Sequence, residues 1–357
     1  MDRKTQGKEL YRNPSLRPLA LTMGDPRGVG PELLIQLLDD LDKVTNFPVL
    51  VIGDYKVLKF ALDKFGTTRA KVRFKTIPVL NDEKEIGLIK KELVILNFSD
   101  LKPEEVFLEP GSKRQGKASL NYIEAGVRLC QSGFCSGLVT LPVSKFALMN
   151  AGCPYPGHTE LLARLDGAKQ VLMMMVLGRI RVGLLSHHIP LKEVVKQVEA
   201  QKILSILKLM NQALVRDFGI KNPKIGVLGV NPHSGEEGKI GNEEKRLIEP
   251  AIKEAQKLKM NVLGPLAGDS AFHQAKIGEY DALLAMYHDQ GLAPLKTLNF
   301  ERVVNVSLGL SFIRTSPGHG TAYDIAWKGI ASAESFYCAI KLAERLIKNR
   351  AKANVRS

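Results

Sequence analysis

The sequence contains only four cysteines in 357 residues, and no two of them form a CxxC pair. Zinc ribbons and dithiol redox motifs require such short spacings, so the sequence offers no support for either class. A large chain without a disulfide framework is typical of a reducing compartment. We therefore expect reduced thiols and a cytoplasmic protein.

Long apolar runs are also missing, because no stretch approaches the roughly 18–20 apolar residues that cross a bilayer. The leader 1–18 is polar and basic, without the apolar core or cleavage site of a secretory signal. The charged stretch 81–91 shows no periodicity and is interpreted as a surface excursion. Neither segment has an assignable role, and no membrane partner is expected.

Two phosphate-binding signatures, GxGxxG and GxxxxGK[ST], are absent. In their place GDPRGVGPE, residues 24–32, follows a strand-like run and leads into a helix with Pro31 near its start. A Gly-rich loop before a helix N-terminus forms a generic anion site. A tight structural turn explains the same residues equally well.

The chain is basic, with a formal charge of +14, and has an ordinary content of 45% apolar and 25% charged residues. A nucleic-acid surface requires a basic stripe with interleaved aromatic residues. Here the lysines are spread over many amphipathic helices, and only the last turns are locally dense. We expect no nucleic-acid partner. A positive field that attracts an anionic substrate is the better interpretation.

Short apolar runs alternate with helical patterns, which predicts an α/β protein of two lobes. Expected strands are 19–23, 48–52, 71–77, 93–98, 138–140, 225–230, 282–286 and 303–307, with a hairpin over 171–185. Expected helices are 55–65, 115–129, 191–198, 202–218, 242–257 with Asn242 as N-cap, and 334–348. A loop is expected over 308–320, followed by a helix through Ile325.

Three histidines each follow an apolar strand and precede a turn: His188, His233 and His288. If these strands share a sheet, the imidazoles converge as in a catalytic divalent-metal site. Asp269 and Asp289 would then be further ligands or would orient the imidazoles. Spacing alone does not establish a metal, and a histidine that merely hydrogen-bonds to the backbone explains each residue equally well.

Several polar residues suit an anionic ligand. His158 and Thr159 open a helix, where the free N–H groups favour an anion, although an ordinary cap by Thr159 is equally consistent. Lys296, Asn305 and Arg314 follow the strand 282–286 at irregular intervals and suit an acidic, oxygen-rich ligand, but scattered surface residues would look the same.

The small residues of 317–326 let backbone approach a ligand, and Asp324 in this stretch suits the two hydroxyls of a ribose. An aspartate there repels a 2′-phosphate, so the stretch favours a cofactor with a free 2′-hydroxyl over one with a 2′-phosphate.

Seven stretches resemble the 4-hydroxythreonine-4-phosphate dehydrogenases of the vitamin B6 pathway. They are LTMGDPRGVGPEL, LVTLPVSK, GHTELLA, SHHIPL, NPHSGEEGKIGNEE, AMYHDQGLAPLK and VNVSLGLSFIRTSPGHGTAYDIA, and they cover the chain from about residue 19 to 330. The resemblance implies a two-lobed α/β/α fold similar to isocitrate and isopropylmalate dehydrogenases, distinct from the Rossmann fold. The lobes are expected at 1–155 plus 322–357 and at 156–321.

The same resemblance implies a set of site residues. The metal ligands fall on His188, His233 and His288, with His187 the neighbour that does not match. The substrate contacts fall on His158, Thr159, Lys296, Asn305 and Arg314, and the cofactor contacts on Gly320 and Asp324. The cofactors implied are NAD, with NADP an alternative, and one divalent ion per site, zinc, magnesium or cobalt. A homodimer with the active site at its interface is also implied.

The implied reaction is oxidation of 4-phosphooxy-L-threonine, with Lys296 or Asp289 as the base, to a β-keto acid that decarboxylates. A related branch oxidises D-erythronate or D-threonate 4-phosphate and shares most of these motifs. Arg27 and the SPGHG run at 316–320 depart from the family pattern, and the latter bears on cofactor contacts. Two rivals remain from the residues alone: a metal-free acyl- or phosphate-transferring enzyme, and a non-enzymatic binding protein.

Overall fold

The computed structural model describes residues 17–82, 93–98, 101–107, 109, 111–155 and 157–356. Most of the basic leader and most of the 81–91 excursion lie outside the described residues. The chain divides into two compact units, unit 1 (1–169 and 310–351) and unit 2 (170–309 and 352–357). Like the division expected from the sequence, this one makes the first unit discontinuous, but it places 156–169 and 310–321 in unit 1.

Unit 1 contains a parallel sheet whose strands lie in the order β3-β4-β2-β1-β5-β12. Except for β3 and β12, its strands are short apolar runs buried along most of their length, as expected of parallel strands covered on both faces. The bounds are β1 (Leu19–Thr22), β2 (Val49–Gly53), β3 (Val79–Leu80), β4 (Leu93–Asn97), β5 (Gly137–Thr140) and β12 (Ile313–Pro317).

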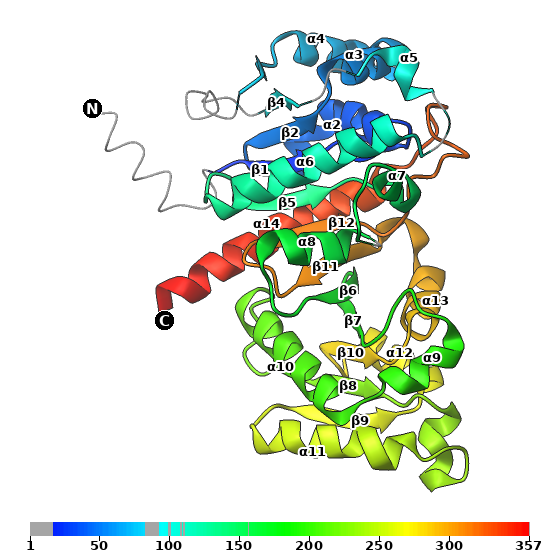
Figure 1. The fold of residues 1–357 in the computed structure, drawn as a ribbon. Coiled ribbons are helices and arrows are strands. Elements are labelled where there is room, and N and C mark those ends of the chain that lie inside the picture. Colours follow the sequence, from blue (N-terminus) through cyan, green and yellow to red (C-terminus); the bar gives the residue numbers. More distant parts are fainter. Residues whose placement is uncertain are drawn as a thin grey trace. The chain divides into compact units, whose positions relative to one another are not determined.

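The helices of unit 1 surround this sheet (Figure 1). They are α2 (Gly30–Val44), α3 (Tyr55–Phe65), α4 (Thr68–Lys75), α5 (Pro103–Val106), α6 (Lys113–Gln131), α7 (Lys145–Asn150), α8 (His158–Asp166) and α14 (Glu334–Arg356). Helix α6 packs on β1, β2 and β5. Its apolar residues recur at helical spacing and face that sheet, which is why the sequence pattern predicted this helix correctly.

Unit 2 contains a mixed sheet in the order β11-β6-β7-β10-β8-β9. Strands β6 (Leu172–Leu177) and β7 (Ile180–Leu184) form the expected hairpin, and β11 (Val304–Leu308) runs antiparallel to β6. The remaining pairs, through β10 (Ala282–Ala285), β8 (Ile225–Leu228) and β9 (Val262–Leu266), are parallel. The helices are α9 (Leu191–Gln197), α10 (Ala200–Arg216), α11 (Glu249–Lys257), α12 (Gly268–Ile277) and α13 (His288–Leu298).

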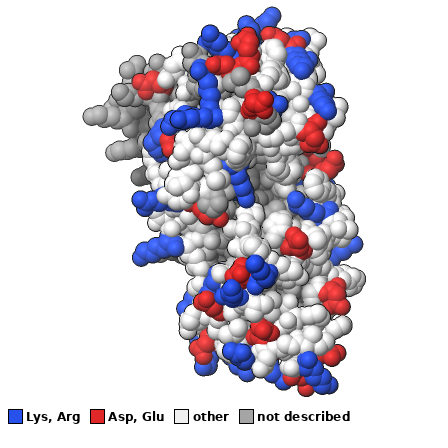
Figure 2. Space-filling view, turned by 45° about the vertical axis from the view of Figure 1, so that its right-hand side comes forward, with Lys and Arg blue, Asp and Glu red and all other residues white. Residues whose placement is uncertain are grey.

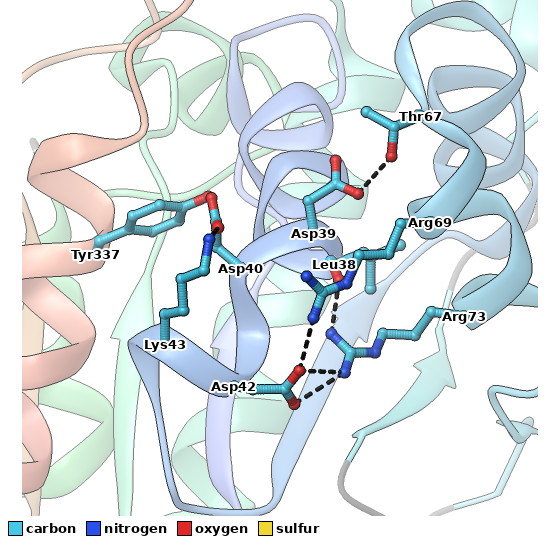
Figure 3. A network of polar contacts seen from close by, with 9 residues as sticks. All are labelled: Leu38, Asp39, Asp40, Asp42, Lys43, Thr67, Arg69, Arg73 and Tyr337. Carbon is cyan, nitrogen blue, oxygen red and sulfur yellow. Dashed lines mark hydrogen bonds and ion pairs between the residues drawn. The ribbon is translucent and has the colours of Figure 1, made fainter.

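The expected strand 71–77 is wrong, because this stretch belongs to helix α4. Thr67 caps the helix by accepting a hydrogen bond from the Ala70 N–H (3.1 Å). Arg73 then donates to the Asp42 carboxylate (2.7 Å) and to the Leu38 carbonyl (2.7 Å) of α2. Figure 3 shows this network between the two helices. The alternation of apolar and polar residues over 71–77 misleads here, because the polar contacts that stabilise the helical conformation come from α2.

Two other expectations near functional segments are wrong, and a third is confirmed only in part. The loop expected over 308–320 contains β12, and the helix expected through Ile325 is a series of turns. The helix expected over 242–257 is present, as a π-helical turn at Glu244–Ile248 that continues into α11, but Asn242 does not cap it. Short or irregular elements of this kind depend on tertiary partners, which periodicity does not reveal.

None of the described helices is long and apolar enough to span a bilayer. On the face drawn in Figure 2, Lys and Arg side chains are interspersed with Asp and Glu. That face therefore carries no basic stripe of the kind a nucleic-acid surface requires.

The cap of helix α3 gives a testable prediction on stability. Asp54 is fully buried, and its carboxylate accepts hydrogen bonds from the N–H groups of Lys56 (3.0 Å) and Leu101 (2.7 Å). Ser112 caps α6 through the Gln115 N–H alone (3.3 Å). We expect Asp54→Ala to lower the free energy of unfolding by about 2–3 kcal/mol. Ser112→Ala should cost about 1 kcal/mol. Urea unfolding measures both, and equal losses would contradict the assignment.

Candidate functional site

The three strand-end histidines lie at the carboxyl ends of neighbouring strands in unit 2. Strand β10 pairs in parallel with β7 on one side and with β8 on the other. His188 follows β7, His233 follows β8 and His288 follows β10. The three strands therefore share one sheet, which is the arrangement that the sequence analysis required for the three imidazoles to converge. In open α/β sheets this is the edge where ligands bind.

His188 and His288 lie next to each other, with ring centroids 5.9 Å apart. The ring centroids of His187 and His188 are 4.9 Å apart. The Nδ1 of His288 is 2.6 Å from Oδ1 of Asp289. This contact orients the His288 ring and leaves its Nε2 for another partner, as is common where imidazole binds a metal. His288 is the first residue of α13 rather than part of a longer turn.

His233 lies on a segment of unusual backbone conformation. His188 has φ of 47°, and residues 233–237 all have φ between 40° and 77°. Non-glycine residues in this left-handed region carry strain, which is concentrated at functional sites in proteins. The buried Glu244 carboxylate accepts hydrogen bonds from the N–H groups of Val230 and Asn231, both at 2.8 Å. These contacts hold the start of the segment in place.

The donor set has the chemistry of a divalent-metal site, namely imidazoles at one sheet edge with a carboxylate behind one of them. Among the described residues, however, no three His, Cys, Asp or Glu side chains are grouped closely enough to hold an ion. The structure brings His188 and His288 together and places His233 on the adjoining strand end. The three-histidine site therefore stays a prediction. Asp269 lies in the first turn of α12.

Two further predicted residues lie in unit 2. Lys296 lies on α13, with its Nζ 5.0 Å from the centre of the Phe300 ring. Burial lowers the pKa of Lys296 below its usual value, which makes the neutral amine easier to reach. Asn305 lies on β11, and its buried Oδ1 has no hydrogen-bond partner among the described residues. A buried polar atom without a partner is costly, so it favours a bound ligand.

In unit 1, Arg314 on β12 is 1% exposed. Its Nε and Nη2 donate to the Thr140 hydroxyl oxygen of β5, at 3.2 and 2.6 Å. Burial lowers the pKa of Arg314 to about 9. A buried guanidinium in an environment that disfavours its charge is stabilised when an anion binds beside it.

His158 is the first residue of α8, and its Nε2 is buried without a hydrogen-bond partner among the described residues. Burial lowers the pKa of His158 well below its usual value, and the charges of Arg314 and Lys145 lower it further. Thr159, which follows it, is buried, and Gly157 rather than Thr159 is the N-cap. A neutral imidazole near two cations in unit 1 suits an anionic, hydrogen-bonding ligand.

Lys145 is a further candidate that the sequence motifs did not single out. It is the first residue of α7, directly after the loop that follows β5. The three strand-end histidines were predicted as site residues because they likewise lie just after the carboxyl end of a strand. Of the predicted cofactor residues, Gly320 has open space where a side chain would start, and Asp324 is exposed within the turns that follow β12.

A family model described as pyridoxal phosphate biosynthetic protein PdxA matches residues 45–343. The chain belongs to this family. The resemblance seen in the sequence motifs is thereby confirmed. Members of the PdxA family named below are dehydrogenases, so the chain is an oxidoreductase rather than a transferase or a non-enzymatic binding protein.

A 4-hydroxythreonine-4-phosphate dehydrogenase from Sulfurihydrogenibium sp. (strain YO3AOP1) is 42% identical over 325 residues, 91% of this chain and 97% of that protein. A relative from Oceanobacillus iheyensis with the provisional name D-threonate 4-phosphate dehydrogenase is 38% identical over 331 residues, 92% of this chain and 97% of that protein. The crystal structure of 4-hydroxythreonine-4-phosphate dehydrogenase from Klebsiella pneumoniae has a TM-score of 0.81 and 33% identity, and covers 94% of this chain and 99% of that one. The α/β fold class is thus confirmed.

The buried His158 makes stability depend on pH. Its pKa is lowered in the folded chain, so the unfolded chain binds more protons below pH 6.5, the usual value. The free energy of unfolding therefore falls as the pH decreases through 6.5, by at most about 1.4 kcal/mol per pH unit for one group. We expect His158→Gln to remove this part of the dependence.

Urea unfolding at about pH 5.5 and about pH 7.5 measures the difference. His273→Gln, which alters an exposed histidine of α12, should keep the wild-type pH dependence. An unchanged slope in His158→Gln would show that His158 titrates normally in the folded chain.

Proposed function

We propose that this chain oxidises the secondary alcohol of 4-phosphooxy-L-threonine, with NAD as the hydride acceptor. The observation that carries the proposal is the buried Arg314 beside His158, whose Nε2 has no hydrogen-bond partner among the described residues, in a chain of the PdxA family. Both residues suit the carboxylate or phosphate of such a substrate. The product, a β-keto acid, loses CO₂ to give 3-amino-2-oxopropyl phosphate, a step of pyridoxal 5′-phosphate biosynthesis.

The residues divide the work by chemistry. Arg314 donates to an anionic group of the substrate, and neutral His158 hydrogen-bonds to it without adding charge, with Thr159 next to it in α8. In unit 2, Asn305 supplies an amide to a polar group. Gly320 and Asp324 receive the adenosine half of the cofactor, where Asp324 accepts hydrogen bonds from ribose hydroxyls.

Oxidation removes a hydride from carbon and a proton from the hydroxyl, so a base is required. Lys296 is the better placed candidate, because burial lowers its pKa and so favours the neutral amine that accepts a proton. Asp289 contacts Nδ1 of His288 and serves to orient that ring. His188, His233 and His288 would hold the divalent cation, which when bound supplies a Lewis acid that lowers the pKa of the substrate hydroxyl.

The family also supports a second substrate class. The Oceanobacillus iheyensis relative, which carries the provisional name D-threonate 4-phosphate dehydrogenase, has an identity close to that of the first relative. Sugar-acid phosphates share the hydroxyl, carboxylate and phosphate groups but lack the amino group. A homodimer with its active site at the interface, and a cytoplasmic location, complete the proposal.

The deciding experiment is NADH formation by the metal-loaded enzyme with 4-phosphooxy-L-threonine, D-erythronate 4-phosphate and D-threonate 4-phosphate in parallel. We expect kcat/KM for the amino substrate to exceed that for the other two by at least about 100-fold. A polar group of the site that hydrogen-bonds to the amine would stay unpaired when an analogue without the amine binds. Preference for the sugar acids would move the enzyme to carbohydrate catabolism. No turnover with any of the three would refute the proposed reaction.

The metal assignment has its own prediction. We expect the wild type to retain about one Zn²⁺ or Co²⁺ per chain after dialysis, and His288→Ala to bind it more than about 100-fold more weakly, since the change removes an imidazole ligand. His273→Ala is the matched control, because this histidine is exposed on α12. Equilibrium dialysis with elemental analysis measures the ion without any assay of turnover. Equal metal content in His288→Ala and His273→Ala would exclude His288 as a ligand.

A further inference from the structure

One fully buried carboxylate in unit 1, Asp25, joins three loops. Its Oδ2 accepts a hydrogen bond from the Tyr323 hydroxyl (2.5 Å), and its Oδ1 accepts one from the Arg27 N–H (2.9 Å). It also accepts a hydrogen bond from the backbone N–H of Ser144. A buried carboxylate is tolerated only when such donors replace water, so this residue has a structural task in each loop.

The three loops follow three neighbouring strands. Strand β5 pairs in parallel with β1 and with β12, so their carboxyl ends lie side by side. Asp25 follows β1, Ser144 follows β5 and Tyr323 follows β12. The carboxylate therefore lies at the sheet edge where α/β proteins bind ligands.

The segment 321–329, which follows β12, is held by the loop 25–32 at further points. Val29 N–H donates to the Thr321 carbonyl (3.1 Å), Trp327 Nε1 donates to the Pro26 carbonyl (3.2 Å), and Glu32 accepts from the Gly329 N–H (3.0 Å). The Trp327 ring packs against three phenylalanine rings, with centroid distances of 5.5 Å to Phe60, 6.1 Å to Phe65 and 5.4 Å to Phe107.

This segment needs external contacts because it is built of turns rather than a helix or strand. Ala322 and Trp327 have φ of 48° and 63°, a strained conformation that persists only when its surroundings impose it. Gly28 permits the close approach, since a Cβ at this position would lie 3.0 Å from the Thr321 carbonyl oxygen. Tyr323 points to Asp25 while its neighbour Asp324 is exposed.

We propose that the Asp25–Tyr323 hydrogen bond positions the segment 321–329 to receive the adenosine half of the nicotinamide cofactor. This inference rests on the proposed function, in which Asp324 binds the ribose. Tyr323 is a positioning residue, because it acts through the backbone that carries Asp324. Loss of its hydroxyl removes one of the contacts that hold the segment. The segment around Asp324 then becomes less ordered, and the free energy needed to order it weakens cofactor binding.

The test compares Tyr323→Phe with Tyr337→Phe. Tyr337 is a matched control, because its hydroxyl also contacts an aspartate, Asp40 of α2 (3.4 Å), but lies on α14 outside the segment (Figure 3). Calorimetry on the metal-loaded enzyme gives Kd for NAD alone and for 4-phosphooxy-L-threonine alone. We expect Tyr323→Phe to weaken NAD binding about tenfold, the effect of one buried hydrogen bond. Substrate binding should stay within about twofold, because the Asp25–Ser144 contact remains.

Equal NAD affinity in the two variants overturns the proposal. So does a tenfold loss of both ligands in Tyr323→Phe, which would indicate a general structural defect. Urea unfolding identifies any difference in stability between the variants. A wild-type enzyme that binds the substrate but no NAD refutes the proposed function itself, which distinguishes the two failures. Selective loss of NAD in Tyr323→Phe alone supports the proposal.

Discussion

Parallel pairing of strands is the constraint on which the functional part of this chain depends. Parallel strands need a crossover between them, so the loops after neighbouring strands gather at one edge of the sheet. In unit 1 this edge carries Asp25, Ser144 and Tyr323. In unit 2 the equivalent edge carries His188 and His288. Residues a hundred or more positions apart in the sequence become neighbours without any long-range sequence signal.

Each unit contains predicted site residues whose polar atoms lie in an unfavourable, buried environment. Arg314 is buried with a lowered pKa, and the buried Nε2 of His158 and Oδ1 of Asn305 have no hydrogen-bond partner among the described residues. By contrast, the surface network of Asp42 with Arg69 and Arg73 is fully paired and only joins two helices (Figure 3). Buried polar atoms without partners are costly, and in the proposed function the substrate satisfies them: its hydroxyl or amine donates to Asn305 Oδ1, and its anionic oxygens accept from Arg314.

The long, strongly periodic elements were predictable from the sequence. Helix α3 and helix α6 carry apolar residues at helical spacing, and the hairpin of β6 and β7 has a glycine at its turn. Errors occur where local patterns are weak: α4 alternates like a strand but is fixed by its cap and by α2, and β12 was taken for a loop. Tertiary contacts outweigh local preference in such short elements.

The sequence by itself determined the α/β class and the family, because these follow from periodicity and from motifs that span most of the chain. It did not reveal the hydrogen bond between Tyr323 and Asp25, the burial of Arg314 or the left-handed backbone at His233. Only the tertiary structure decided these, since burial and hydrogen-bond partners depend on which strands become neighbours, and strand order is a property of the folded sheet rather than of any local stretch.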